Sequence, residues 1–213
     1  MNTVANQPVL PGQTSLAPSF QITLALKKLV DRQDLSEMDM RAAVGEIMRG
    51  DSTPARTAAF LVALRMKGET ATEIAAAASV MRELAESVPM PIEGEVLDIV
   101  GTGGDPYGAV LNISSVASII ASAAGVPVVK HGNRGASSAS GASDVLSALG
   151  VNLDIQPPRV AEVLRETGIT FAFATLFHPG FRHAGPTRRE LGISTLFNIL
   201  GPLCNPARPE ASA

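Results

Sequence analysis

Residues 101–105 read Gly-Thr-Gly-Gly-Asp and directly follow an apolar run at 96–100. Glycine reaches positive φ values at little cost, so successive backbone N–H groups of such a segment can turn toward one anion. A small-residue helix is predicted from Ser114 to Ala124, and its N-terminus would add the positive end of the helix dipole. The spacing matches neither a Walker A loop nor a Rossmann GxGxxG fingerprint. The segment therefore predicts a loop that binds phosphate or pyrophosphate, with a plain glycine-rich turn as the alternative.

A second polar segment, 130–141, follows a β-branched run at 126–130. Lys130 ends this run of valines, and further hydrogen-bond donors follow it: Arg134, Ser137, Ser138 and Ser140. A cation and hydroxyl groups beside a predicted helix start suit a phosphate ligand. The alternatives are a surface lysine and a serine that caps the helix.

The third polar segment, 178–190, follows the apolar run 169–177 and contains His178, His183, Arg188 and Arg189. The histidines do not have the spacing of a metal site. An arginine that points into a crevice could bind a substrate carboxylate through two parallel hydrogen bonds. The alternatives are histidines with ordinary hydrogen bonds in a loop and arginines that cover a helix face.

All three polar segments follow predicted strands, and helices are predicted between these strands at 114–124, 141–149 and 157–167. Strands that alternate with helices indicate βαβ units and a parallel sheet. The carboxyl ends of parallel strands lie at one edge, where ligands bind. We therefore expect the three polar segments to converge on one site.

The first part of the chain follows a different pattern, that of four short helices in series. N-cap residues mark three helix starts: Ser36 with Asp39, Thr53 with Pro54, and Thr70 with Glu73. The first helix is expected to bury one apolar stripe: Ile22, Leu26, Leu29 and Val30. We expect a flexible tail at 1–20, a helical domain at 21–90 and an α/β domain at 91–213.

The bulk composition agrees with a folded α/β protein, because 46% of the 213 residues are hydrophobic. The net charge of −3 gives no reason to expect a nucleic-acid partner. A single cysteine, Cys204, excludes an intramolecular disulfide and a Cys-rich zinc site. The N-terminal segment lacks the regions of a signal peptide, and no apolar run approaches the roughly 20 residues that span a bilayer. These features predict a cytoplasmic protein with no membrane partner.

Five ordered motifs resemble the anthranilate phosphoribosyltransferase family of tryptophan biosynthesis: DIVGTGGD, NISS, KHGNRGASSASG, FHPGFRHAG and RRELGISTLFNILGPLCNPARP. The resemblance runs from about residue 20 to the end of the chain. It implies the nucleoside phosphorylase/phosphoribosyltransferase-like fold, in which a small N-terminal helical domain joins a larger α/β domain with a mainly parallel sheet. It also implies a homodimer formed through the helical domain.

The same resemblance implies an activity and its site. Phosphoribosyl would pass from 5-phosphoribosyl-1-pyrophosphate (PRPP) to the amine of anthranilate, with Mg²⁺, to give N-(5-phosphoribosyl)anthranilate and pyrophosphate. The PRPP-binding residues would be Gly101, Thr102, Gly103, Gly104, Asp105, Asn112, Ser114, Ser115, Lys130, Ser137 and Ser138, with Ser114 also a Mg²⁺ ligand. The anthranilate-binding residues would be Gly101, Asn133, His178 and Arg188, with Arg188 on the carboxylate. No catalytic acid or base is assigned, because positioning and charge stabilisation would suffice for a neutral amine nucleophile.

The chain departs from the family pattern at three places. Ser115 stands where the family usually has threonine, and the segment 106–111 looks one residue longer than usual. The chain ends at Ala213, where the family continues with more sheet and an Asp-Glu pair that holds a second Mg²⁺. A sheet without its remaining strands would expose an edge. We therefore expect a truncated chain or fragment that is inactive alone unless the remainder is supplied in trans.

Two alternative functions stay open. A pyrimidine-nucleoside phosphorylase shares the fold and a glycine-rich phosphate loop, although the motifs KHGNR and FNILGPLCNPARP argue against it. The other alternative is a non-catalytic fragment that only binds PRPP or other anions, or dimerises through its helical domain.

Overall fold

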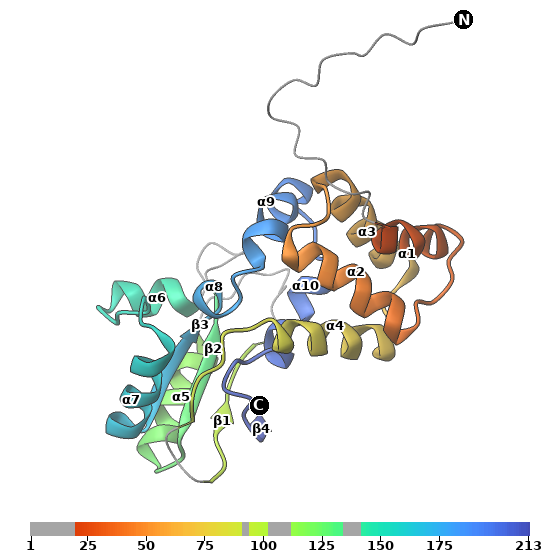
Figure 1. Cartoon of the computed structure of the whole chain (residues 1–213). Helices are drawn as coiled ribbons and strands as arrows, with labels where there is room; N and C mark the ends of the chain where they lie inside the picture. Colours follow the sequence, from red (N-terminus) through yellow and green to blue (C-terminus); the bar gives the residue numbers. More distant parts are fainter. Residues whose placement is uncertain (1–19, 91–93, 102–111, 134–141) are drawn as a thin grey trace, which may run out of the picture.

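The structure is a computed structural model that describes residues 20–90, 94–101, 112–133 and 142–213 (Figure 1). Its first part consists of four helices: α1 (Phe20–Val30), α2 (Glu37–Arg49), α3 (Pro54–Lys67) and α4 (Ala71–Glu83). None of the helices within the described ranges has the length and apolar character needed to cross a membrane.

The predicted helix starts are confirmed at the level of individual hydrogen bonds. Ser36 and Asp39 form a capping box at α2, and Thr70 and Glu73 form another at α4. One residue of the predicted apolar stripe is wrongly placed, because Val30 is 70% exposed at the end of α1. Ala25 takes its place in the core, since it lies on the same helix face as Ile22 and Leu29.

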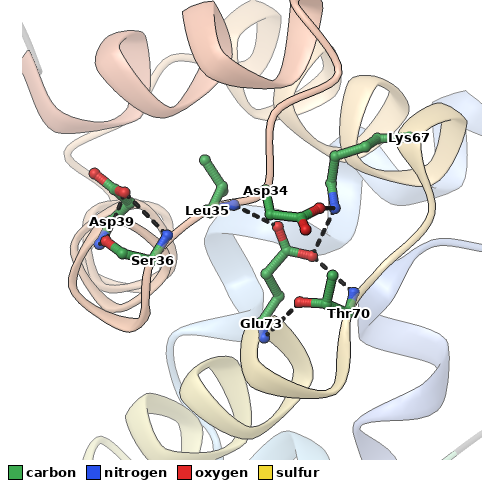
Figure 2. A network of polar contacts seen from close by, with 7 residues as sticks. All are labelled: Asp34, Leu35, Ser36, Asp39, Lys67, Thr70 and Glu73. Atoms are coloured by element: carbon green, nitrogen blue, oxygen red, sulfur yellow. Dashed lines mark hydrogen bonds and ion pairs between the residues drawn. The ribbon is translucent and has the colours of Figure 1, made fainter.

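A buried carboxylate ties the α1–α2 connection to the start of α4, as Figure 2 shows. Glu73 is fully buried, and its Oε1 accepts the Leu35 N–H at 2.8 Å. Its Oε2 accepts the Thr70 N–H at 2.8 Å and a hydrogen bond from Lys67 Nζ at 2.9 Å. Lys67 Nζ also contacts Asp34 at 2.8 Å, but the Asp34 side chain is largely exposed. Glu73 is therefore the buried acceptor for three donors, namely the Lys67 ammonium and two backbone N–H groups.

Replacing Glu73 by alanine is expected to lower the free energy of unfolding by about 3–5 kcal/mol, because it leaves a buried ammonium without its buried partner. Urea unfolding followed by far-UV circular dichroism measures this change. Glu83→Ala is the matched control on the same helix, since Glu83 pairs with Arg41 at the surface. An equal loss of stability in the two variants would contradict the role given to Glu73.

The second part of the chain forms a four-stranded parallel sheet with the order β3-β2-β1-β4. The strands are β1 (Leu97–Asp98), β2 (Val128–Gly132), β3 (Ile169–Phe173) and β4 (Ala211–Ser212). Helices lie between them in the chain: α5 (Ile113–Ala123), α6 (Ala142–Ala148) and α7 (Pro157–Thr167). The predicted parallel sheet and the predicted helix at 157–167 are confirmed.

The region after β3 differs from the expected strand and loop. The apolar run 169–177 is a strand only to Phe173, and helix α8 (Ala174–Phe177) follows. The third polar segment then forms helix α9 (Phe181–Leu191), even though Pro186 lies inside it. The physical reason is packing, because Ala184 and Thr187 on one face of α9 are buried. Short helix α10 (Leu196–Ile199) and the 3₁₀ turn η1 (Gly201–Leu203) complete this region.

Helices α9 and α10 pack against the N-terminal helices, as their positions in Figure 1 illustrate. One hydrophobic cluster joins α1–α4 to residues from the later part of the chain: Ala184, Leu196, Phe197, Leu200 and Cys204. The approach is close at Gly180, where an added Cβ would lie 2.6 Å from the Met48 carbonyl oxygen. The predicted domain limits at 90 and 91 stay predictions, but the helical core draws on both sides of them.

Candidate active site

Lys130 connects the ends of two strands to the start of a helix. It lies in β2, is 2% exposed, and its Nζ donates hydrogen bonds to the Ile99 carbonyl and to Ser114 Oγ, the latter at 3.1 Å. Ile99 directly follows β1, and Ser114 lies in the first turn of α5. The structure thus brings together two predicted PRPP-binding residues, Lys130 and Ser114, at the carboxyl edge of the sheet.

The charge of Lys130 is held in a mostly apolar setting. Burial lowers the pKa of Lys130, and the carboxylate of Asp98 opposes this effect. A buried ammonium beside a helix N-terminus presents positive potential to an anion from two sources. This corner therefore suits a phosphate or pyrophosphate group.

The other residues at the start of α5 keep polar groups available. Asn112 is the N-cap residue, and its side chain makes no capping hydrogen bond. Ser115 is buried, and its Oγ makes no hydrogen bond within the described parts of the chain. Buried hydroxyls normally have a partner, so a ligand oxygen is a suitable one here.

Two buried histidines lie next to this corner. His131 follows Lys130, and its Nδ1 lies 2.9 Å from the Gly201 carbonyl oxygen, to which it donates. Burial, followed by the neighbouring His178, lowers the pKa of His131 to about 4, so its ring is neutral at pH 7. His178 is also buried, its pKa is lowered by burial, and its Nε2 donates to the Cys204 carbonyl at 2.9 Å. The predicted anthranilate-binding role of His178 stays a prediction, and its hydrogen bond to the Cys204 carbonyl holds the segment around Cys204.

Arg188 stands between two aromatic rings on the helical side of the molecule. Its guanidinium carbon lies 5.6 Å from the centre of the Phe181 ring and 5.5 Å from that of Phe197. Its Nη2 donates to Asn198 Oδ1 at 3.3 Å, and burial lowers its pKa, although an arginine stays charged. No carboxylate of the described residues forms an ion pair with it. Arg188 therefore has donors available for the carboxylate of a ligand.

A row of rings runs from the lysine corner to this arginine. The His131 and His178 ring centres are 5.2 Å apart, and His178 and Phe181 follow at 6.0 Å in an edge arrangement. Phe181 contacts Arg188, so four side chains link residue 131 of the sheet to residue 188 of the helical side. The Lys130 corner and Arg188, the predicted carboxylate-binding residue, are therefore linked by a continuous row of packed side chains.

The remaining predicted residues have looser surroundings or lie outside the described ranges. Gly101 is exposed with open space around it, and Asn133 is exposed and accepts a hydrogen bond from Thr175 Oγ1 at 3.5 Å. Six predicted PRPP-binding residues lie outside the described residues: Thr102, Gly103, Gly104, Asp105, Ser137 and Ser138.

Sequence reasoning missed three polar residues of this region: Asp98, His131 and Asn205. Asp98 is fully buried in β1, and its Oδ1 accepts the His131 N–H at 3.1 Å. Burial raises the pKa of Asp98, while the Asn205 amide, the His131 N–H and the charge of Lys130 lower it. A carboxylate inside an apolar strand was the available signal, because charged side chains are rarely fully buried.

Comparison with known proteins identifies the family of this chain. A profile described as "Glycosyl transferase family, a/b domain" matches residues 93–213, and one described as "Glycosyl transferase family, helical bundle domain" matches residues 23–85. The chain belongs to this glycosyl transferase family. The predicted fold class, a helical domain with an α/β domain around a parallel sheet, is confirmed.

Relatives within the glycosyl transferase family carry the name that the motifs predicted. The anthranilate phosphoribosyltransferase of Clavibacter michiganensis is 68% identical over 185 residues, which are 87% of this chain and 52% of that protein. The crystal structure of anthranilate phosphoribosyltransferase from Thermus thermophilus has a TM-score of 0.82 at 47% identity, over 89% of this chain and 57% of that one.

A third relative was solved with ligands. The anthranilate phosphoribosyltransferase of Saccharomyces cerevisiae in complex with PRPP and Mg has a TM-score of 0.80 at 32% identity, over 90% of this chain and 56% of that one. These matches confirm the resemblance to anthranilate phosphoribosyltransferases. The chain spans about half the length of the curated relatives it matches.

Proposed function

We propose that this chain contributes the PRPP site and the anthranilate carboxylate site of an anthranilate phosphoribosyltransferase. The observation that carries the proposal is the buried Lys130, whose ammonium lies at the N-terminal turn of α5 on Ser114 Oγ. The relatives' names favour this activity over that of a pyrimidine-nucleoside phosphorylase.

In the proposed reaction, the bond between C1′ of the ribose and the pyrophosphate oxygen breaks while a bond from the anthranilate nitrogen to C1′ forms. The amine then loses one proton to the departing pyrophosphate or to water. Negative charge develops on the departing pyrophosphate, so fixed positive groups stabilise the transition state. Lys130 and the N–H groups at the start of α5 supply such charge, with the hydroxyls of Ser114 and Ser115 as hydrogen-bond partners.

Arg188 would hold the other substrate by its carboxylate. The rings of Phe181 and Phe197 fix the guanidinium plane, which keeps the entropy cost of binding low. A clamped carboxylate leaves the neighbouring amine as the free end of the molecule. The contribution to catalysis is then positioning of a neutral nucleophile rather than proton transfer.

The residues at this corner fit a Mg²⁺ ion that is bound mainly through substrate. Ser114 Oγ is a hard oxygen ligand, and Mg²⁺ at phosphate sites commonly takes few protein ligands and several substrate or water oxygens. Across the ranges that the structure describes, no cluster of three His, Cys, Asp or Glu residues could hold a metal. When bound, Mg²⁺ would neutralise charge on the pyrophosphate.

The proposal includes a cytoplasmic homodimer that assembles through the helical domain. Cys204, the single cysteine, is buried, and burial raises the pKa of its thiol to about 12. A single buried thiol without a disulfide partner is compatible with the reducing cytoplasm. Sedimentation velocity of the purified chain tests the dimer.

The second candidate is a binding module without turnover that takes PRPP or another anion at the same Lys130 corner. Calorimetry with PRPP and Mg²⁺, run beside an assay of anthranilate fluorescence loss, separates the two. Binding with loss of fluorescence supports the enzyme, and binding without it supports the module. Failure to bind PRPP contradicts both.

A further inference from the structure

The backbone ladder between β1 and β2 stops early, and two side chains continue it. Leu97 pairs with Val128 in the parallel register, and the Leu97 N–H donates to the Pro127 carbonyl at 2.9 Å. In a regular parallel ladder the next residue in phase, Ile99, would bond the Val129 carbonyl and the His131 N–H. Both of those groups have other partners.

Asn205 and Asp98 take these two positions. Asn205 Nδ2 donates to the Val129 carbonyl at 2.8 Å, and Asp98 Oδ1 accepts the His131 N–H at 3.1 Å. The peptide groups on each side of Lys130 are thus held by buried side chains. The carbonyl of Ile99, released from the ladder, accepts the hydrogen bond from Lys130 Nζ.

Asp98 is a costly way to end a strand pair. The side chain is fully buried, and Oδ2 has no partner in hydrogen-bond geometry within the described part of the chain, although the Asn205 amide lies near enough to lower the pKa of Asp98. An unsatisfied buried oxygen lowers stability, and a plain backbone ladder would avoid that cost. Burial also raises the pKa of Asp98, because removal from water disfavours the charged carboxylate. The presence of an aspartate at position 98 is therefore better explained by a role in function than by a contribution to stability.

We propose that Asp98 is a positioning residue for Lys130. By taking the His131 N–H in place of Ile99, it keeps β1 and β2 apart at their carboxyl ends, and the Lys130 ammonium occupies this opening against Ser114. Without Asp98, Ile99 can close the ladder and withdraw its carbonyl from Lys130. The inference rests on the proposed function, in which Lys130 binds PRPP.

The test compares Asp98→Ala with Asp98→Asn, whose amide oxygen can still accept the His131 N–H. Calorimetry with PRPP and Mg²⁺ on the full chain is expected to show affinity weakened by about tenfold or more in Asp98→Ala, as for other supports of a ligand-binding group. Asp98→Asn is expected to restore most of that affinity. Anthranilate affinity, measured by fluorescence, stays at the wild-type value in both variants. Asp154→Ala, a change at an exposed aspartate, is the control.

A folded Asp98→Ala chain with wild-type PRPP affinity overturns the proposal, and so does an Asp98→Asn chain as weak as Asp98→Ala. If Asp98→Ala does not fold, Asn205→Ala replaces it, because it removes the other side chain that holds the opening. Unchanged PRPP affinity in a folded Asn205→Ala chain then counts against the proposal.

A second readout does not need PRPP. Acetylation of Lys130 by acetic anhydride, followed by mass spectrometry, is expected to be several-fold faster in Asp98→Ala than in Asp98→Asn, since both variants lose the carboxylate charge and only alanine removes the acceptor of the His131 N–H. Equal rates in the two variants reject the positioning role. If the wild-type chain binds no PRPP but the two acetylation rates differ in this way, the proposed function fails and the positioning role stands.

Discussion

Replacing Lys130 by methionine is expected to weaken PRPP binding by about 10- to 100-fold, while anthranilate binding keeps its wild-type affinity. Methionine keeps an unbranched stem of similar length in this 2%-exposed position and removes only the charged end. Hydrogen bonds to charged groups contribute about 1.5–3 kcal/mol, which corresponds to that range of affinity. Calorimetry with PRPP in the presence of Mg²⁺ measures the effect.

The control for Lys130→Met is Lys27→Ala, which removes a lysine from the exposed face of α1. The melting temperature of each variant is recorded first, because Lys130 also faces the buried Asp98 and its loss lowers stability. A folded Lys130→Met chain that binds PRPP as tightly as wild type would remove the observation on which the proposed function depends.

The second large effect is expected at Arg188. Arg188→Ala should weaken anthranilate binding by about 10- to 100-fold, because it removes a charge-assisted pair that a half-buried guanidinium can make with a carboxylate. PRPP affinity should stay unchanged. Titration of anthranilate fluorescence measures the first quantity, and calorimetry measures the second.

Two further variants sharpen the result at Arg188. Arg188→Lys keeps the charge but not the planar fork between Phe181 and Phe197, so we expect an affinity between those of wild type and Arg188→Ala. Arg189→Ala removes the exposed neighbour on the same helix and should have little effect. An anthranilate dependence that is unchanged in Arg188→Ala is incompatible with the carboxylate role.

Much of this fold could be predicted because the interactions that fix the helix ends join residues only a few positions apart in the sequence. The capping boxes at Ser36 and Thr70 and the left-handed glycines Gly50 and Gly168 fix helix ends through hydrogen bonds within a few residues. The apolar runs and the helices between them are also recognisable from neighbouring residues, and their alternation predicted the parallel sheet. Lys130 was identified as a site residue because a cation at the end of a run of valines needs an explanation.

What escaped prediction depends on contacts between distant residues. The helix α9 contains Gly185 and Pro186, which locally favour a turn, and packing of Ala184 against the helical core outweighs them. The opening beside Lys130 depends on Asn205, which is 76 residues from Val129, and on Asp98, which is 33 residues from His131. No local pattern in the chain indicates either contact.

The shared core of α1–α4 with α9 and α10 has a consequence for the order of synthesis. The four N-terminal helices leave the ribosome long before Ala184, Leu196 and Phe197, which complete their core. Until α9 and α10 are made, the apolar surface of α1–α4 that packs against these three residues stays uncovered. A chain that ended near residue 90 would contain α1–α4 but would lack the later residues that complete their hydrophobic core.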